Sequence, residues 1–104
     1  KMSRETISRI EVLGSGKLLV CLESGGRPDY SNIYREGVGV YWNEEQKGFI
    51  SADVKDWSYS KWFRHIVDTA SGCGIHCNLS NSTKWVGFPE EEKLDLLRDF
   101  AIKK

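Results

Sequence analysis

Residues 58–72, SYSKWFRHIVDTASG, decide the fold class, because their apolar side chains repeat with the period of an α-helix. The apolar positions form one continuous helical face: Tyr59, Trp62, Phe63, Ile66, Val67 and Ala70. Asp56 or Ser58 is expected to cap the amino end of this helix, with Trp57 available as a hydrophobic staple. The stretch therefore predicts an amphipathic helix that covers a core.

The chain before this helix has the composition of β-strands. Apolar, β-branched and aromatic residues gather in four segments, which Gly-rich or polar turns separate. The segments are residues 6–13, 17–23, 32–42 and 49–54. SGGRPD, at residues 24–29, is the clearest loop, with two glycines and a proline. Together these features predict a four-stranded antiparallel meander with one buried face.

Two further strands are expected after the helix. Residues 75–79 and 84–88 flank the polar stretch SNST, at residues 80–83, and predict a hairpin. With a second helix at the carboxyl end, the predicted order is ββββαββα. The predicted class is α+β, in which two helices pack on an antiparallel sheet made of the meander and the hairpin.

The second helix is expected to begin at Pro89, the position that proline favours. Three glutamates, at positions 90–92, follow in its first turn, where they complement the helix dipole. Leu94 and Leu97 are expected to face inward, and Leu96 is placed at the margin of the buried face.

Length and composition fit one globular domain, residues 1–104, which is long enough to bury a core without staples. Fifteen basic and fifteen acidic side chains cancel, so the charge does not favour direct nucleic-acid binding. No apolar run is long enough to span a membrane, and no secretion leader is recognised, so a cytoplasmic protein is expected. Lys1 before Met2 is interpreted as an artificial extension.

The stretch SGCGIHC, residues 71–77, raises the question of a metal or redox site. Cys73, His76 and Cys77 supply three of the four ligands that a structural zinc needs, and the other candidates are isolated. The two cysteines are spaced C-x₃-C rather than C-x₂-C, which does not fit a thioredoxin-like motif. Gly74 falls where the helix should end, so we predict a helix-to-strand turn, with no metal and no cofactor.

No catalytic motif is recognised. The sequence lacks a G-x-S-x-G elbow and a phosphate-binding glycine loop. His65 lies beside the apolar face of the first helix, and His76 lies in a predicted strand. We predict that the protein is not an enzyme, although a small enzyme or ligand-binding accessory domain using either histidine stays open.

Two segments combine aromatic with acidic side chains. YWNEE, at residues 41–45, ends a predicted strand, and DVKDWSY, at residues 53–59, leads into the first helix. If they lie close together, they form an acidic patch with aromatic anchors, a usual ingredient of protein interfaces. The predicted partner-binding residues are Trp42, Glu44, Glu45, Asp53, Asp56 and Trp57. The alternative is that both tryptophans belong to the core and the acids only solubilise the protein.

A small, charge-balanced α+β domain with acidic-aromatic loops resembles the immunity proteins of bacterial polymorphic toxins and contact-dependent growth inhibition systems. The resemblance covers overall length and element order. It implies a cytoplasmic protein that binds one cognate toxin, often a nuclease, and occludes its basic active site with acidic residues. Glu44, Glu45, Asp53 and Asp56 would then face the toxin, with the two tryptophans as anchors.

A second resemblance is to whirly-type single-strand-binding proteins. It implies a sheet face on which bases stack against exposed aromatic side chains, while basic side chains contact the backbone. The residues concerned are Tyr30, Tyr34 and Trp42, with Arg9, Lys17 and Arg35. The first helix is followed by only two predicted strands, where that fold has four. The oligomeric state is left open.

Overall fold

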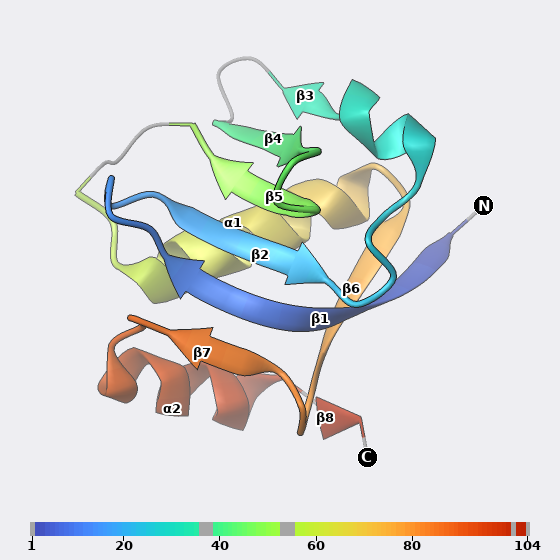
Figure 1. Ribbon diagram of the computed structural model, residues 1–104. Helices are drawn as coiled ribbons and strands as arrows, with labels where there is room; N and C mark the ends of the chain where they lie inside the picture. Colours follow the sequence, from blue (N-terminus) through green and yellow to red (C-terminus); the bar gives the residue numbers. More distant parts are fainter. Residues whose placement is uncertain (1, 36–38, 53–55, 101, 104) are drawn as a thin grey trace.

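The computed structural model describes residues 2–35, 39–52, 56–100 and 102–103 (Figure 1). Its strands are β1 Ser3–Val12, β2 Leu18–Leu22, β3 Tyr34–Arg35, β4 Val40–Asn43, β5 Gly48–Ser51, β6 Ile75–Ser80, β7 Lys84–Val86 and β8 Ile102–Lys103. Its helices are the 3-10 helix η1 Pro28–Asn32 and the α-helices α1 Tyr59–Gly72 and α2 Glu90–Asp99. Within these ranges no helix combines the length and the apolar character needed to cross a membrane.

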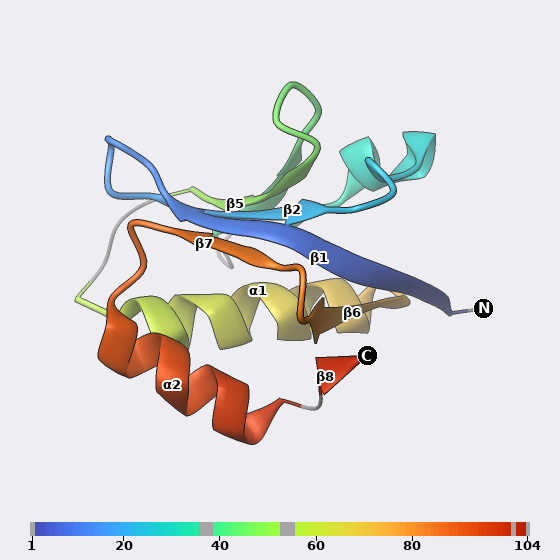
Figure 2. The same cartoon turned by 60° about the horizontal axis from the view of Figure 1, so that its bottom comes forward.

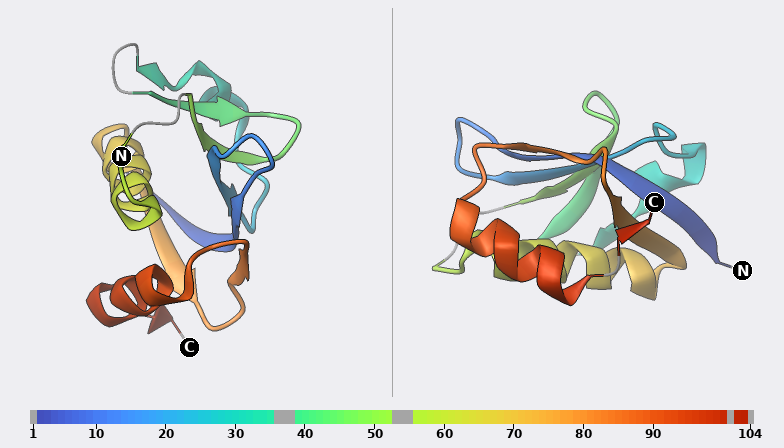
Figure 3. Two further views of the ribbon diagram at one scale, coloured as in Figure 1. Left: turned by 90° about the vertical axis from the view of Figure 1, so that its left-hand side faces the viewer. Right: turned by 90° about the horizontal axis from the view of Figure 1, so that it is seen from below.

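One mixed sheet organises the molecule. Its strand order is β3-β4-β5-β2-β1-β6-β8, and β7 lies beside the carboxyl half of β1. Both α-helices lie on the same side of the sheet (Figure 2), and two further views show α1 packed along it (Figure 3). The buried side of the sheet and α1 share the main core. The α+β class, with a sheet packed by two helices, is confirmed.

The predicted meander is wrong in its strand order. Strand β2 pairs with β5, whereas β4 pairs with β5 on its far side and β3 pairs with β4. The loop after β2, which contains η1, carries the chain past the place of β5 to the edge of the sheet (Figure 1). Gly48 lets β5 approach β2, because a Cβ atom there would lie 2.5 Å from the carbonyl oxygen of Val20.

The predicted carboxyl-terminal hairpin is also wrong. Strands β6 and β7 do not pair with each other, and both run parallel to β1. The polar turn between them does not reverse the chain direction; it is a step from one strand to the next that keeps the same direction. Thr83 fixes this step, because its hydroxyl donates to the carbonyl of Ile7 (2.7 Å) and accepts from the amide of Ser80 (3.0 Å). The sheet is therefore mixed, and not wholly antiparallel as predicted.

Helix α1 forms as its sequence predicts. Ser58 is the N-cap, and its hydroxyl accepts from the backbone amide of Lys61 at 3.1 Å. Trp57 packs against Trp62 with ring centroids 4.7 Å apart, which is the staple geometry. The helix ends at Gly72, and Gly74 takes a φ of 86° before β6 begins. The predicted helix-to-strand turn is confirmed.

Helix α2 is rotated relative to its predicted orientation. Leu96 is fully buried, whereas Leu94 is 57 % exposed. The buried face includes the charged residue Glu92, whose carboxylate accepts from the backbone amide of Ser60 at 2.6 Å. This contact caps α1 from α2, and Leu96 lies one turn further along the same face. A count of apolar residues does not give the orientation of α2, because one of its inward-facing residues is an acid.

Candidate functional site

The predicted acidic-aromatic residues do not form one patch. Glu44 and Glu45 lie in the turn before β5, and Asp56 lies beyond the other end of β5, before α1. The turn and the start of α1 are therefore at opposite ends of this strand (Figure 1). Asp53 lies outside the described residues. The condition on which the predicted patch depended is not met.

Trp42 is buried rather than presented as an anchor. Its side chain is 6 % exposed and packs edge-on against Tyr30 and Phe49, at centroid distances of 5.4 and 5.0 Å. Its indole N–H reaches toward the surface and donates to Oε1 of Glu44 at 2.8 Å. Trp42 is therefore a core residue that positions the surface carboxylate of Glu44 through a hydrogen bond.

Trp57 is half-buried at the other end of β5. Besides its staple contact with Trp62, its ring lies 5.2 Å from that of His65. The ammonium group of Lys61 lies 4.6 Å above the Trp57 ring. These contacts give Trp57 a structural role at the start of α1.

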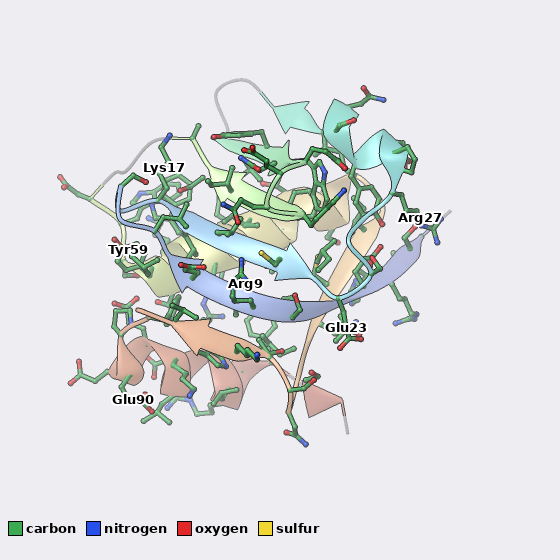
Figure 4. The ribbon with its side chains drawn as sticks, in the orientation of Figure 1. Arg9, Lys17, Glu23, Arg27, Tyr59 and Glu90 are labelled. Carbon is green, nitrogen blue, oxygen red and sulfur yellow. The ribbon has the colours of Figure 1, made fainter. Side chains whose placement is uncertain are left out.

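A different group of charged side chains comes together at the end of the sheet that holds Glu44 and Glu45. The loop of residues 23–33 and the turn of residues 43–48 meet there, since residues of both line one pocket and the amide of Leu22, just before the loop, donates to the carbonyl of Lys47 at 3.2 Å. The charged residues of the two segments are all exposed. We name Glu23, Arg27, Asp29, Glu44, Glu45 and Lys47 the loop–turn surface. Figure 4 shows Glu23 and Arg27 at this end and Lys17 at the opposite end.

An open pocket of about 440 Å³ lies between the loop and the turn, and we call it the loop–turn pocket. Its lining residues are Gly25, Gly26, Arg27, Pro28, Ser31, Glu44 and Lys47. Gly26 allows the loop to lie against the buried tryptophan, because a Cβ atom there would come within 2.4 Å of the Trp42 ring. The loop and the turn, which form the two walls of the pocket, therefore both contact Trp42.

The Glu44 side chain is held on both of its carboxylate oxygens. Lys47 pairs with Oε2, and Trp42 donates to Oε1. The hydrogen bond from Lys47, and then that from Trp42, lowers the pKa of the Glu44 carboxyl group. Glu44 is therefore ionised at neutral pH and fixed in one orientation.

A buried carboxylate supports the other wall. Glu5 of β1 is 5 % exposed and accepts from the hydroxyl of Tyr30 at 2.5 Å and from that of Ser24 at 2.7 Å. The Ser24 hydroxyl also accepts from the amide of Gly26 at 3.0 Å. Buried charge is tolerated when hydrogen bonds satisfy it, and these bonds fasten both ends of the loop to β1.

We predict that the Tyr30–Glu5 bond stabilises the fold up to about pH 10 and is lost above it. Burial, and then the hydrogen bond to Glu5, raises the pKa of Tyr30 from 10.0 to about 12. Folding therefore favours the protonated phenol, and its contribution disappears as the pH rises from the ordinary value through the folded one. Urea unfolding at about pH 9 and about pH 12 measures the effect, with Tyr30→Phe as the control. A stability difference between the two proteins that stays constant over this range would contradict the prediction.

The thiols of Cys21 and Cys77 do not have the character of nucleophiles. Burial raises the pKa of the Cys77 thiol to about 12, with the charge of Glu5 as a further cause, and burial also raises the pKa of Cys21. Thiols of this kind react slowly at neutral pH. In the part of the chain that the structure describes, no three His, Cys, Asp or Glu side chains could together hold a metal ion.

Two of the three aromatic side chains that the single-strand-binding alternative needs on an exposed sheet face, Tyr30 and Trp42, are buried. Tyr30 is 2 % exposed, and like Trp42 it belongs to the main core on the helix side. Arg9 pairs with Glu11 at 3.1 Å on the opposite face, and Lys17 lies at the far end of the sheet (Figure 4). The side chains of Tyr34 and Arg35 are outside the description.

Sequence reasoning identified Glu44 and Glu45 but missed their neighbours on the loop–turn surface. Arg27 and Asp29 lie in the loop SGGRPD, which was recognised only as a loop. Lys47 follows the stretch YWNEE and was not singled out. A charged residue between two glycines and a proline was the available signal, but the partner segment depends on the pairing of β2 with β5.

A family model described as Integron Cassette Protein Hfx_Cass5 matches residues 6–83. A solved structure described as "Structure from the mobile metagenome of North West Arm Sewage Outfall: Integron Cassette Protein Hfx_Cass5" is 33 % identical in sequence. The match covers 94 % of this chain and 96 % of that chain, with a TM-score of 0.43. No curated protein matches the chain.

Proposed function

The chain belongs to the Integron Cassette Protein Hfx_Cass5 family, and we propose that it is a non-catalytic immunity protein that neutralises a cognate bacterial toxin. The proposed place of action is the cytoplasm, and the proposed partner is a basic toxin domain, such as a nuclease.

The loop–turn surface carries this proposal. Four of its six charged side chains are carboxylates, all six are exposed, and three of them line the loop–turn pocket. An acidic excess attracts a basic partner and speeds association, while a preformed pocket lowers the entropic cost of binding. Glu44 and Glu45 keep the role that the resemblance gave them, and Glu23 and Asp29 take the role that it gave to Asp56.

The toxin is sought by capture on the immobilised protein from lysates of bacteria that carry the cassette. Each captured protein is then produced in a test strain with and without this chain. The proposal expects one captured protein that stops growth alone and permits growth when the two are produced together. If no captured protein inhibits growth, or if growth is not restored, the immunity function is wrong.

We predict that the double variant Glu23→Lys, Glu45→Lys associates with the captured toxin at least tenfold more slowly at low salt, because its electrostatic steering is reversed. Neither side chain contributes to the bonds that hold Glu44, so the fold should be unchanged. The matched control is Asp56→Lys, Asp68→Lys, which changes the net charge equally from exposed positions elsewhere. Stopped-flow association rates at two salt concentrations measure the effect, and an equal loss in both variants would show that only net charge matters.

A further inference from the structure

The charged side chains that line the loop–turn pocket are two cations, Arg27 and Lys47, and one carboxylate, Glu44, which is ion-paired with Lys47. Arg27 lines the pocket from the loop side and has no ion-pair partner within the described residues. A guanidinium group offers five donors in a planar fork that fits the two oxygens of a carboxylate or phosphate group.

Lys47 lines the pocket from the turn side, and its backbone is strained. Its φ is 59°, and it is the one non-glycine residue of the described chain with a positive φ. A glycine would adopt this conformation without strain, so the lysine side chain is retained at an energetic cost. Backbone strain of this kind concentrates at functional sites. The Glu44 carboxylate holds the ammonium group of Lys47 at the pocket.

The two segments that carry these cations are each fastened to the core. The loop that carries Arg27 is fastened through Ser24 and Tyr30 to the buried Glu5. The turn that carries Lys47 is fastened through Glu44 to Trp42. Preorganised donors on two walls favour a ligand group that fits between them.

We propose that the loop–turn pocket is an oxyanion site, in which a carboxylate or phosphate group is bound by Arg27 from one wall and Lys47 from the other. The group comes either from a free small molecule or from a side chain of a protein partner. The site goes beyond the immunity function, which depends on the acidic rim, and it can exist whether or not a toxin is the partner.

The test is a titration of the ¹⁵N-labelled protein with sodium phosphate and, separately, with sodium acetate, followed by nuclear magnetic resonance at constant ionic strength. The indole N–H of Trp42 reports on the pocket, because it is bonded to Glu44. Saturable shifts are expected for at least one probe. Arg27→Gln and Lys47→Gly are each expected to weaken its binding at least tenfold, whereas the control Lys17→Gln, at the opposite end of the sheet, leaves it unchanged (Figure 4).

The outcomes separate the two sources and the possible failures. A dissociation constant in the micromolar range points to a free small molecule, because the ion alone then binds tightly. A dissociation constant of about 1 mM points to a side chain that a partner supplies, because the rest of the partner would then have to add the missing affinity. Lys47→Gly is also expected to raise the melting temperature, because glycine removes the strain, so weaker binding cannot be attributed to unfolding. Shifts that sodium chloride reproduces, that do not saturate, or that persist in Arg27→Gln would overturn the site while leaving the growth test of the immunity function unaffected.

Discussion

Replacing Gly26 with alanine is expected to destabilise the fold by about 3 kcal/mol, from backbone strain and overpacking together. The φ of Gly26 is 86°, a conformation that alanine adopts only with strain. The added Cβ would also lie 2.4 Å from the Trp42 ring, which cannot move away because Tyr30 and Phe49 pack against it.

Gly25→Ala is the matched control for this prediction. The φ of Gly25 is 82°, but a Cβ atom there would meet nothing within 4 Å. It should therefore cost only about 1 kcal/mol, from the strain alone. Urea unfolding of both variants measures the difference, which isolates the contact between the loop and Trp42. Equal losses for the two alanines would mean that the loop does not rest on this ring.

Trp42→Ala is expected to destabilise the fold by about 4 kcal/mol, which is typical of a large aromatic side chain removed from a core. The ring is 6 % exposed and contacts two other buried aromatic rings. Removing it leaves a cavity beneath the loop–turn pocket and frees Glu44 from its indole donor. The loss is measured by urea unfolding.

Trp42→Phe separates the two roles of this residue. Phenylalanine keeps most of the packing, so the loss of stability should be about 1.5 kcal/mol. The Glu44 carboxylate loses one of its two donors, and its pKa should rise toward the ordinary value. A loss below about 0.5 kcal/mol for Trp42→Ala would instead fit an exposed anchor, as the sequence suggested.

Local patterns in this sequence predict individual elements well. Helix α1 has one unbroken apolar face, a serine cap and a glycine stop, and each is found where the pattern places it. These signals arise between residues a few positions apart, so the neighbouring sequence is enough to interpret them. Helix α2 shows the limit, because its inward Glu92 caps a distant helix.

The sheet order could not be obtained in the same way. The pairing of β2 with β5 depends on the close approach that Gly48 allows, and the step from β6 to β7 depends on Thr83. Both are contacts between segments that are distant in the sequence. Alternation of apolar residues predicts that a strand exists, but it does not specify the neighbour.

Prediction of the candidate site likewise succeeded for local features and failed for contacts between distant segments. Glu44 and Glu45 were found because a polar turn exposes them, whereas Trp42 is a core residue, as the alternative interpretation held. Arg27 joins them only because the loop and the turn meet beside β5. The prediction of which charged segments lie side by side thus failed where it depended on the sheet order.

The most direct test of the loop–turn surface is the footprint of the captured toxin on the ¹⁵N-labelled protein, measured by nuclear magnetic resonance. The account predicts that the largest shift changes and line broadening lie in residues 23–33 and 43–48. Changes confined to α1, α2 and the residues around Trp57, with residues 23–33 and 43–48 unaffected, would contradict it.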